Sequence, residues 1–463
     1  MRPLALSQIA AWCQARLVGE DRVVHAVGVD TRTLMPGALY VALCGENHDG
    51  HDFCATARAA GACALLVERE VDETLPQIVC ADTRIALAQI ATRLAQARVT
   101  RLIAITGSNG KTTTRTLVRA ILAQSDSEVW SSAGNRNNEI GLPLAVIDQP
   151  ERARLAVYEM GAGAPGDIAY LAAIARPAIA LVTNVAPAHL ERMGSLLGIA
   201  DTKAAVYDAL PADGIAVINA DDAFAPYFRA RAGARRVLDY GLEVSAQVSA
   251  DAIQPHEGGS RFVLRSPWGE AEVTMPLPGR HQVGNALAAA ALALSAGASL
   301  DDVVIGLADA PGVPGRLQSV TLADGTVVLD DSYNANPASV SAAIDTLAAQ
   351  ARRDGVQAWL VLGDMRELGP AAAVLHAEVG KRAREAGVTR LLSVGEMSRH
   401  AAHAFGAGGE HFSDQAALVE RIRTRSGEPV LLLVKGSRGS RMERIVDALV
   451  GAGAGAEGEG HAA

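Results

Sequence analysis

Thr106-Gly107-Ser108-Asn109-Gly110-Lys111-Thr112-Thr113 stands between a short apolar run at residues 102–105 and a stretch typical of a helix at 114–123. A strand, a glycine turn and the start of a helix, in this order, form a phosphate-binding loop. The glycines allow backbone N–H groups to close around phosphate oxygens, Lys111 supplies a positive charge, and the Thr112 hydroxyl is a suitable ligand for Mg²⁺. The stretch therefore predicts a binding site for a nucleoside triphosphate.

This loop departs from the general pattern at one position. Ile105 stands five residues before Gly110, where the strict pattern has Gly or Ala. A Gly-Lys-Thr tripeptide after an apolar run also occurs in ordinary turns. The residues farther along the chain decide how the loop is interpreted.

Length and composition indicate a multidomain globular protein. The chain has 463 residues, more than the roughly 250–300 at which a single hydrophobic core stops growing. Apolar residues make up 49% and charged residues 20%, which suits large buried cores and excludes a disordered chain. The net charge of −9 offers no basic field for a polyanion, so we expect no nucleic-acid partner.

Cysteine usage and hydropathy predict a cytoplasmic protein. The five cysteines all lie within the first 80 residues and lack Cys-x-x-Cys spacing, which favours buried reduced thiols over disulfides or zinc. Residues 1–20 are interpreted as an amphipathic helix and not as an export signal. The longest small and apolar stretch, 286–298, is shorter than the ~20 residues of a membrane span. We expect no membrane insertion, and a monomer.

The pattern of strands and helices predicts an α/β fold with three domains. Residues 1–98 form a small mixed α/β N-terminal domain, and 99–315 a central P-loop-type ATPase domain with a mostly parallel sheet. Residues 316–450 form a C-terminal Rossmann-like domain, and 451–463, a Gly/Ala/Glu repetition, a disordered tail. The expected strands of the two larger domains are 102–105, 155–159, 179–184, 215–219, 327–329, 358–363, 391–395 and 430–435.

Polar strings follow several of these strands, where the carboxyl edge of a parallel sheet carries its site. They are 134-GNRNNEIG-141, 159-EMGA-162, the segment 184–195 with His189 and Glu191, 281-HQVGN-285, 312-GVPGR-316, 330-DDSYNANP-337, 363-GDMRELG-369 and 435-KGSR-438.

This set of strings resembles the Mur ligase family over nearly the whole chain. The Tyr-Asn-Ala-Asn-Pro string at 333–337 is similar to the member that joins D-Ala-D-Ala to a UDP-N-acetylmuramoyl-tripeptide, and the Asp-Asn-Pro-Arg string used to select diaminopimelate is absent. The resemblance implies an ATP-dependent carboxylate–amine ligase of cell-wall peptidoglycan synthesis. It would act through an acyl phosphate and a tetrahedral intermediate and yield UDP-muramoyl-pentapeptide, ADP and phosphate.

The resemblance also assigns catalytic and metal-binding roles. A carboxylate approaching ATP is repelled by roughly 4 kcal/mol per pair of unit charges at ~4 Å and an effective dielectric of ~20, so cations must offset the repulsion. Thr112 and Glu159 are similar to the ligands of one Mg²⁺, His189 to a ligand of a second, and Lys111 would stabilise the transferring phosphoryl group. Lys203 matches the lysine that CO₂ carbamylates to a metal-binding carboxylate, although Ala205 stands where relatives commonly have Glu.

The remaining site residues are implied by the same resemblance. ATP is expected at Gly107, Ser108, Asn109, Gly110, Lys111, Thr112, Thr113, Asn285, Arg316 and Asp331. The UDP substrate is expected at Thr31, Arg32, Gly45, Asp49, Gly50, His51, Asn135 and Asn138. The dipeptide is expected at Asn334, Asn336 and Arg438.

Some polar residues have simpler interpretations. His281 is interpreted as a helix cap outside the site, and Asp364 and Glu367 as turn residues.

Three other functions remain open: another Mur-type amino-acid ligase, a P-loop kinase or nucleotide switch, and a silent binding protein. The kinase or switch would turn over ATP without an amine.

Overall fold

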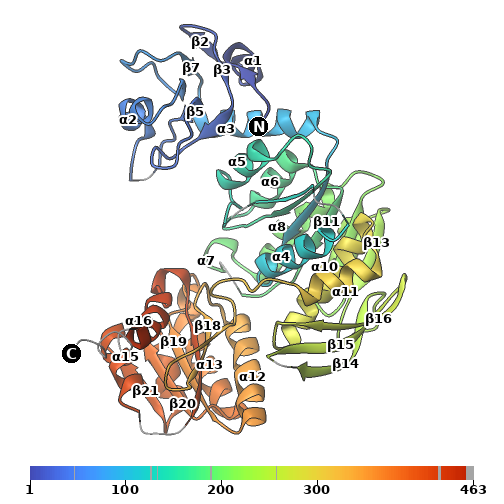
Figure 1. The fold of residues 1–463 in the computed structure, drawn as a ribbon, viewed down its shortest axis with the longest axis vertical. Helices are drawn as coiled ribbons and strands as arrows, with labels where there is room; N and C mark the ends of the chain where they lie inside the picture. Colours follow the sequence, from blue (N-terminus) through green and yellow to red (C-terminus); the bar gives the residue numbers. More distant parts are fainter. Residues whose placement is uncertain are drawn as a thin grey trace, which may run out of the picture.

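Three α/β bodies follow one another along the long axis of the molecule (Figure 1). The structure is a computed structural model, and it describes residues 1–463 except 46, 126–127, 133, 188–189, 257, 426–428 and 455–463. The expected helix over residues 1–20 is wrong. This segment contains two short strands and one helix of seven residues, because the first strand pairs with residues 23–24 farther along the chain.

The first body is built on a five-stranded sheet in the order β2-β7-β6-β5-β4, parallel except for β2. Its strands are β1 (Leu4–Ala5), β2 (Arg16–Val18), β3 (Val23–Val24), β4 (Ala26–Gly28), β5 (Ala38–Val41), β6 (Ala64–Val67) and β7 (Gln77–Val79). Its helices are α1 (Leu6–Trp12), η1 (Gly50–Phe53), α2 (Cys54–Ala59) and α3 (Thr83–Ala97). The α3 helix packs on α5 and α6 of the second body, and both bodies share one hydrophobic core.

The second body carries a six-stranded parallel sheet in the order β13-β12-β11-β8-β10-β9. Its strands are β8 (Arg101–Thr106), β9 (Val129–Ser131), β10 (Leu155–Glu159), β11 (Ile179–Val182), β12 (Ile215–Asn219) and β13 (Arg236–Tyr240). Its helices are α4 (Lys111–Leu122), α5 (Gly141–Asp148), α6 (Asp167–Ala175), α7 (Leu190–Met193), α8 (Leu196–Asp208), α9 (Ala225–Ala232), α10 (Arg280–Ala296) and α11 (Leu300–Ala308).

The strands of this sheet are continuous apolar runs because helices cover both of its faces. The α4 and α10 helices pack together on one face, and α10 is buried along most of its length. An antiparallel sheet of three strands, which the sequence analysis did not predict, extends this body: β14 (Ser249–His256), β15 (Gly259–Ser266) and β16 (Gly269–Met275). In the described part of the chain, no helix combines the length and the hydropathy that a membrane span needs.

The third body is a six-stranded sheet in the order β17-β18-β22-β19-β20-β21, parallel except for β17, with a core on each face. Its strands are β17 (Gln318–Thr321), β18 (Val327–Asp331), β19 (Gln357–Gly363), β20 (Arg390–Val394), β21 (Gly409–Phe412) and β22 (Val430–Lys435). Its helices are α12 (Pro337–Asp354), η2 (Gly369–Ala371), α13 (Ala372–Ala386), α14 (Arg399–Phe405), α15 (Gln415–Arg423), η3 (Arg438–Ser440) and α16 (Glu443–Ala454). The α16 helix continues past the expected start of the tail at 451, and residues 455–463 lie outside the described residues.

Candidate active site

The phosphate-binding loop lies where three neighbouring strands of the central sheet end. The β8 strand leads into the loop, β10 ends beside it at Glu159, and β11 ends on its other side at Val182. Because the crossovers leave β8 in both directions, this edge is a switch point of the sheet, which is the usual place for a ligand. Gly107 has φ +144° and lies so close to Thr183 that a Cβ atom would clash with its hydroxyl.

Side chains that directly follow β11 hold the loop in shape. Asn184 Oδ1 accepts a hydrogen bond from the Asn109 backbone N–H at 2.9 Å, and the Thr183 hydroxyl donates to the Asn109 carbonyl at 2.6 Å. Lys111, the first residue of α4, folds its ammonium back onto the carbonyls of Gly107 (2.7 Å) and Ser108 (3.3 Å). Burial lowers the pKa of Lys111, Glu159 opposes this shift, and Arg316 adds to it. These hydrogen bonds preform the loop. Its Lys111 ammonium is a positive charge that burial disfavours.

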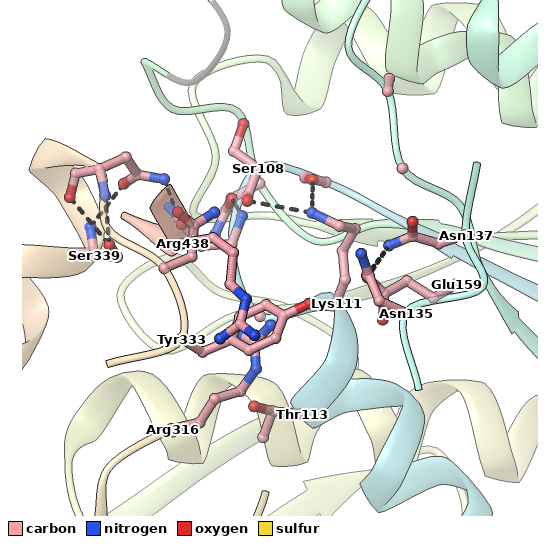
Figure 2. A pocket seen from close by; sticks show the side chains of 18 of the residues that line it. Ser108, Lys111, Thr113, Asn135, Asn137, Glu159, Arg316, Tyr333, Ser339 and Arg438 are labelled. Atoms are coloured by element: carbon pink, nitrogen blue, oxygen red, sulfur yellow. Dashed lines mark hydrogen bonds between the residues drawn. The ribbon is translucent and has the colours of Figure 1, made fainter. Parts of the chain in front are cut away.

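Glu159 is the centre of a buried polar network. Its two carboxylate oxygens accept hydrogen bonds at 2.8 Å, one from the Thr112 hydroxyl and one from the Asn137 amide. Figure 2 shows Glu159 beside Asn135 and Asn137. Burial works against its charge, but Lys111, Arg115 and these hydrogen bonds keep the pKa of Glu159 below its usual value. An ionised carboxylate and a hydroxyl at this distance are oxygen donors that fit Mg²⁺.

Lys203 lies on α8 and lines the same cleft as Lys111. Only 3% of Lys203 is exposed. Burial, followed by the charge of Lys111, holds the pKa of Lys203 well below its usual range. No carboxylate within the described residues contributes to this pKa. The amine is therefore placed in a site that favours its neutral form.

The third body closes the cleft from the opposite side. Arg316 donates from Nη2 to the Thr112 hydroxyl at 3.0 Å, and Asn336 Nδ2 donates to Asn109 Oδ1 at 2.6 Å. The cleft between the bodies has a volume of about 700 Å³, and it is lined both by the phosphate-binding loop and by residues 331 and 333–336. Figure 2 shows Tyr333, Arg316 and Arg438 together on one side and Lys111 with Glu159 on the other.

A buried ion pair shapes the wall formed by the third body. Lys435 at the end of β22 donates to Asp331 Oδ2 at 2.5 Å and to the Asn334 carbonyl at 2.9 Å, because β18 and β22 are neighbours in register. Burial raises the pKa of Asp331, and Lys435 offsets this only in part. His281, at the start of α10, also lines the cleft, and burial together with Lys435 lowers its pKa to about 4.

Comparisons with known proteins agree with this geometry. Three family models match in succession: "Mur ligase family, catalytic domain" over residues 23–102, "Mur ligase middle domain" over 105–293 and "Mur ligase, glutamate ligase domain" over 315–438. The chain is 43% identical to the UDP-N-acetylmuramoyl-tripeptide–D-alanyl-D-alanine ligase of Escherichia coli strain K12, with 97% of this chain and 99% of that protein aligned. The chain belongs to the Mur ligase family.

Solved structures of the family support the fold. MurF from Acinetobacter baumannii superposes with a TM-score of 0.91 at 31% identity, covering 97% of this chain and 99% of that one. The MurF ligase of Thermotoga maritima, solved in complex with ADP, has a TM-score of 0.82 at 27% identity and covers 92% and 97%. The expected resemblance to Mur ligases and the three-domain α/β fold are both confirmed, and the chain is an ATP-dependent ligase.

Most of the predicted cleft residues are brought together. The residues expected to bind ATP line the cleft, except Thr112, which is hydrogen-bonded to two residues of its wall. Asn135, Asn138, Asn334, Asn336 and Arg438 line it as well. Two of these also have structural roles, since Asn138 accepts from the Gly141 N–H at 2.8 Å and Asn336 caps α12 through Ser339. His189 lies outside the described residues.

Sequence reasoning missed several residues of the Mur ligase cleft. His281 was placed outside the site and lines it instead, because the start of α10 faces the third body. Asn137 was passed over in favour of its two neighbours, yet its amide holds Glu159. Asn184, Lys435 and Tyr333 belong to strings that the sequence analysis singled out, and all three line the cleft. The position of each after a buried strand was the available signal.

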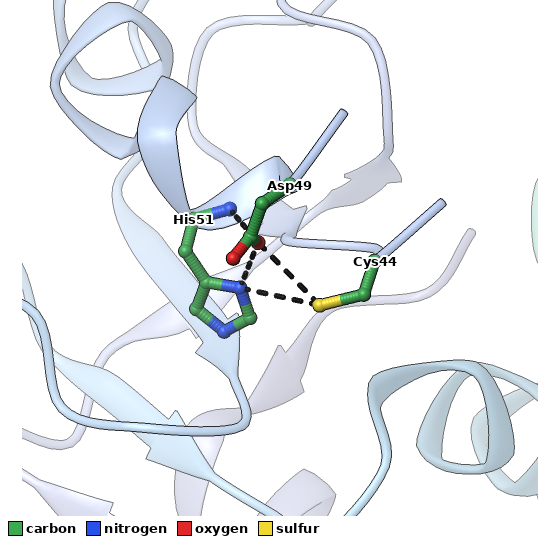
Figure 3. Close-up of side chains that lie close together, drawn as sticks. All are labelled: Cys44, Asp49 and His51. Carbon is green, nitrogen blue, oxygen red and sulfur yellow. Dashed lines mark hydrogen bonds and ion pairs between the residues drawn. The ribbon is translucent and has the colours of Figure 1, made fainter. Parts of the chain in front are cut away.

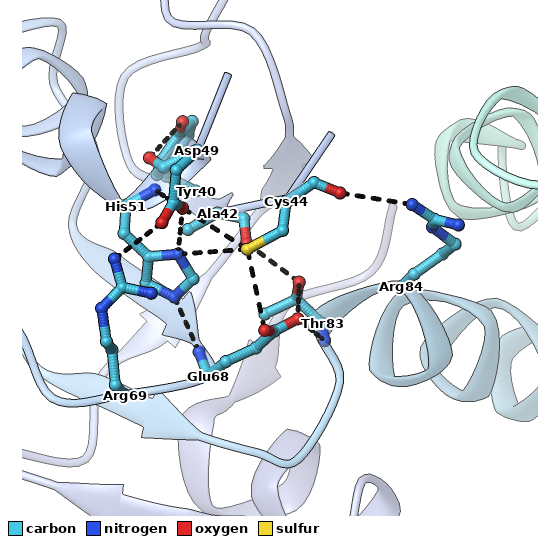
Figure 4. Close-up of polar contacts among 10 residues, drawn as sticks. Tyr40, Ala42, Cys44, Asp49, His51, Glu68, Arg69, Thr83 and Arg84 are labelled. Atoms are coloured by element: carbon cyan, nitrogen blue, oxygen red, sulfur yellow. Dashed lines mark hydrogen bonds and ion pairs between the residues drawn. The ribbon is translucent and has the colours of Figure 1, made fainter. Parts of the chain in front are cut away.

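The first body holds a second polar cluster, Cys44, Asp49 and His51, whose ligating atoms lie within 4.8 Å of one another (Figure 3). His51 Nε2 accepts from the Glu68 backbone N–H at 2.9 Å, so the proton of a neutral ring is on Nδ1, which donates to Asp49 at 2.6 Å. Arg69 bonds the other oxygen of Asp49 at 2.7 Å and holds the pKa of that carboxyl well below its usual range (Figure 4). These atoms satisfy one another and leave no free ligand set for a metal.

This cluster includes residues of the predicted UDP site. The His51 side chain is only 1% exposed, so in this structure it holds the loop from within. Gly50 is also buried, and a Cβ there would meet the backbone of Leu43 at 2.5 Å. Arg32 is exposed and pairs with Asp30, lowering the pKa of that carboxyl to about 2. All five cysteines are free thiols, as expected, but Cys44 is exposed.

Proposed function

We propose that this chain joins D-Ala-D-Ala to the terminal carboxylate of a UDP-N-acetylmuramoyl-tripeptide and converts ATP to ADP and phosphate. The product is the UDP-muramoyl-pentapeptide of cell-wall peptidoglycan synthesis, a process required for cell shape and division. The observation that carries the proposal is the cleft itself, which residues 331 and 333–336 line together with the phosphate-binding loop. The relative from E. coli carries the name of this activity at 43% identity.

The first step transfers the γ-phosphoryl group of ATP to the carboxylate. A carboxylate oxygen forms a bond to phosphorus as the bond to ADP breaks, which gives an acyl phosphate. Lys111, which is bonded to the loop carbonyl of Gly107, and Arg316, which is bonded to the Thr112 hydroxyl, offset the negative charge that gathers at this point. Thr112 and Glu159 would hold a Mg²⁺ ion, which would add positive charge that offsets the repulsion between ATP and the carboxylate.

The second step forms the amide. The neutral amine of the dipeptide attacks the acyl carbon, its proton is lost, and the tetrahedral intermediate collapses with release of phosphate. The third body brings the dipeptide to the cleft, because residues 331 and 333–336, Lys435 and Arg438 of its strings line it. Closure of this body excludes water that would hydrolyse the acyl phosphate.

Lys203 is proposed to carry a carbamate that helps to hold a second Mg²⁺, with His189 as a further ligand. Carbamylation needs a neutral amine, and the low pKa of the buried Lys203 supports this requirement. The position of Lys203 on the wall of the same cleft as Lys111 supports this role.

The first body is proposed to bind the UDP end of the acceptor through Thr31, Arg32, Gly45 and the backbone near Asp49. Asn135 and Asn138 line the cleft and would contact the sugar-peptide. A UDP-linked precursor and ATP are cytoplasmic substrates, so we place the reaction in the cytoplasm. The enzyme acts as a monomer in this proposal.

Phosphate release from ATP tests the proposal. The purified protein is supplied with UDP-muramoyl-tripeptide and with D-Ala-D-Ala, a single amino acid, or no amine. Release that requires the dipeptide, with a product mass equal to the joined peptide, supports the proposal. Release that requires a different amine indicates another Mur-type ligase, and release without any amine indicates a kinase or nucleotide switch.

A further inference from the structure

Tyr333 lies between two guanidinium groups in the cleft. Arg316 Cζ is 4.5 Å from the centre of its ring and Arg438 Cζ is 5.7 Å from it, both within the range of a cation–π contact. The two arginines come from different parts of the chain, one from the segment that enters the third body and the other from η3 after β22. The close view in Figure 2 shows the three side chains stacked beside the phosphate-binding loop.

The backbone beneath the ring is fixed from two sides. The Tyr333 N–H donates to the Gly315 carbonyl at 3.1 Å, next to Arg316. Lys435 donates to the Asn334 carbonyl at 2.9 Å, and the Ser437 hydroxyl donates to the Ala335 carbonyl at 3.2 Å, next to Arg438. The ring is therefore a rigid spacer between two arginines whose own backbones are tied to its turn.

The two guanidinium groups face different parts of the cleft. Arg316 reaches the Thr112 hydroxyl at 3.0 Å, and its Nε atom is buried without a hydrogen-bond partner among the described residues. A buried donor without a partner is costly, so this atom is suited to a ligand oxygen. Arg438 has a side chain that is 65% exposed and one acidic partner, Glu443, at 3.3 Å. A guanidinium has five donors, so Arg438 has room for a second carboxylate.

We propose that Tyr333 is a positioning residue that holds Arg438 where it captures the C-terminal carboxylate of the incoming D-dipeptide. This inference rests on the proposed function. The amine of the dipeptide must reach the acyl phosphate near Arg316, and an extended dipeptide places its carboxylate roughly 7 Å away. The two ring distances allow a separation of this size between the guanidinium groups. The ring thus sets the span that the substrate must bridge.

The stack also limits the motion of Arg438. A free arginine at the surface loses much rotamer freedom when it binds a ligand, which weakens binding. The Tyr333 ring orders the guanidinium before the dipeptide arrives. With a residue that lacks an aromatic face at this position, Arg438 keeps its charge but is no longer held in one position. The preference for a dipeptide with a C-terminal carboxylate over one without it therefore falls.

The test compares D-Ala-D-Ala with its C-terminal amide, which keeps the amine and loses the negative charge. The value of kcat/KM is measured for both at saturating ATP and UDP-muramoyl-tripeptide, in the wild type and in Tyr333→Phe, Tyr333→Leu and Arg438→Met. We expect the wild type and Tyr333→Phe to prefer the acid by about tenfold or more, the value of one charged hydrogen-bonded contact. We expect Tyr333→Leu and Arg438→Met each to bring this ratio close to one. The double variant, Tyr333→Leu with Arg438→Met, should lower the ratio no further than either single variant.

Controls separate the possible failures. Arg421→Met removes a guanidinium 5.5 Å from the Trp359 ring, a contact of the same kind outside the cleft, and keeps the wild-type ratio. If Tyr333→Leu keeps the wild-type ratio, or if the wild type does not distinguish acid from amide, the inference is wrong. If Tyr333→Leu does not fold, Arg438→Met decides. No turnover of D-Ala-D-Ala by the wild type contradicts the proposed function instead.

Discussion

The cleft around Glu159 and the cluster around His51 are both polar groups placed beside parallel strands, yet their chemistry differs. In the first body, both ring nitrogens of His51 are engaged, and Asp49 is shared between His51 and Arg69. In the cleft, Lys203 has no compensating carboxylate among the described residues, and Arg316 Nε has no partner among them. Ligating residues that lie close together therefore do not by themselves indicate a ligand-binding site. Buried charged or polar groups that lack a partner in the protein do indicate one, because a ligand supplies the missing interaction.

The most severe test of this difference is the removal of Lys111. We expect Lys111→Ala to lower turnover by about 10²–10³-fold, since a buried cation at the transferring phosphoryl group is lost. Phosphate release at saturating substrates measures it. Binding of the UDP substrate, which our proposal assigns to the first body, stays within twofold of wild type. Near-normal turnover would remove Lys111 from the mechanism.

Lys203 tests whether an uncompensated buried amine signals a modification. We expect Lys203→Ala to lower turnover by about 10²-fold, in the range found when a group that supports a metal site is lost. A short-chain carboxylic acid that enters the space left by the side chain should restore part of the rate. Mass spectrometry cannot replace this assay, because carbamates are lost on acidification. Loss of activity without any rescue would count against the carbamate.

A variant of His281 tests whether burying a titratable side chain in the cleft lowers the free energy of unfolding. The pKa of His281 is lowered from the usual 6.5 to about 4. Between pH 6.5 and pH 4, the unfolded chain therefore binds a proton at this histidine that the folded chain does not. The free energy of unfolding therefore falls as pH falls through this window, by no more than about 3 kcal/mol for this group. Denaturant titrations at pH 7 and pH 4.5 should show a smaller fall in His281→Asn. Equal falls in both proteins would contradict the shift.

His51 tests the opposite claim, that the first-body cluster is structural. We expect His51→Leu to lower the free energy of unfolding by about 1–3 kcal/mol, because a buried backbone N–H and Asp49 lose their partner. Thermal unfolding with and without Zn²⁺ measures this and also tests the metal. Zn²⁺ should not stabilise the wild type more than Cys44→Ser. A larger shift in the wild type would make the cluster a metal site and break the comparison.

Local pattern accounts for the parts of the fold that were predicted well. The ends of β10, β12 and β22 agree with the apolar runs, because strands buried on both faces must be apolar along their whole length. The antiparallel sheet of β14–β16 was missed although its strands alternate, as Arg261, Phe262 and Leu264 do between exposed and buried positions. The strand at Leu4–Ala5 is too short to carry a pattern and exists only through its pairing with β3.

The sequence by itself determined the phosphate-binding loop, the order of three α/β domains and the strings that carry the Mur ligase resemblance. Each of these depends on residues close together in the chain, where backbone preference and hydropathy act directly. Only the tertiary structure decided which of several adjacent polar residues in a sequence string faces the cleft. Asn137 bonds Glu159, Tyr333 lies between two arginines, and His51 turns inward. These orientations depend on strand register and on the docking of one body against another, and both bring together residues far apart in the chain.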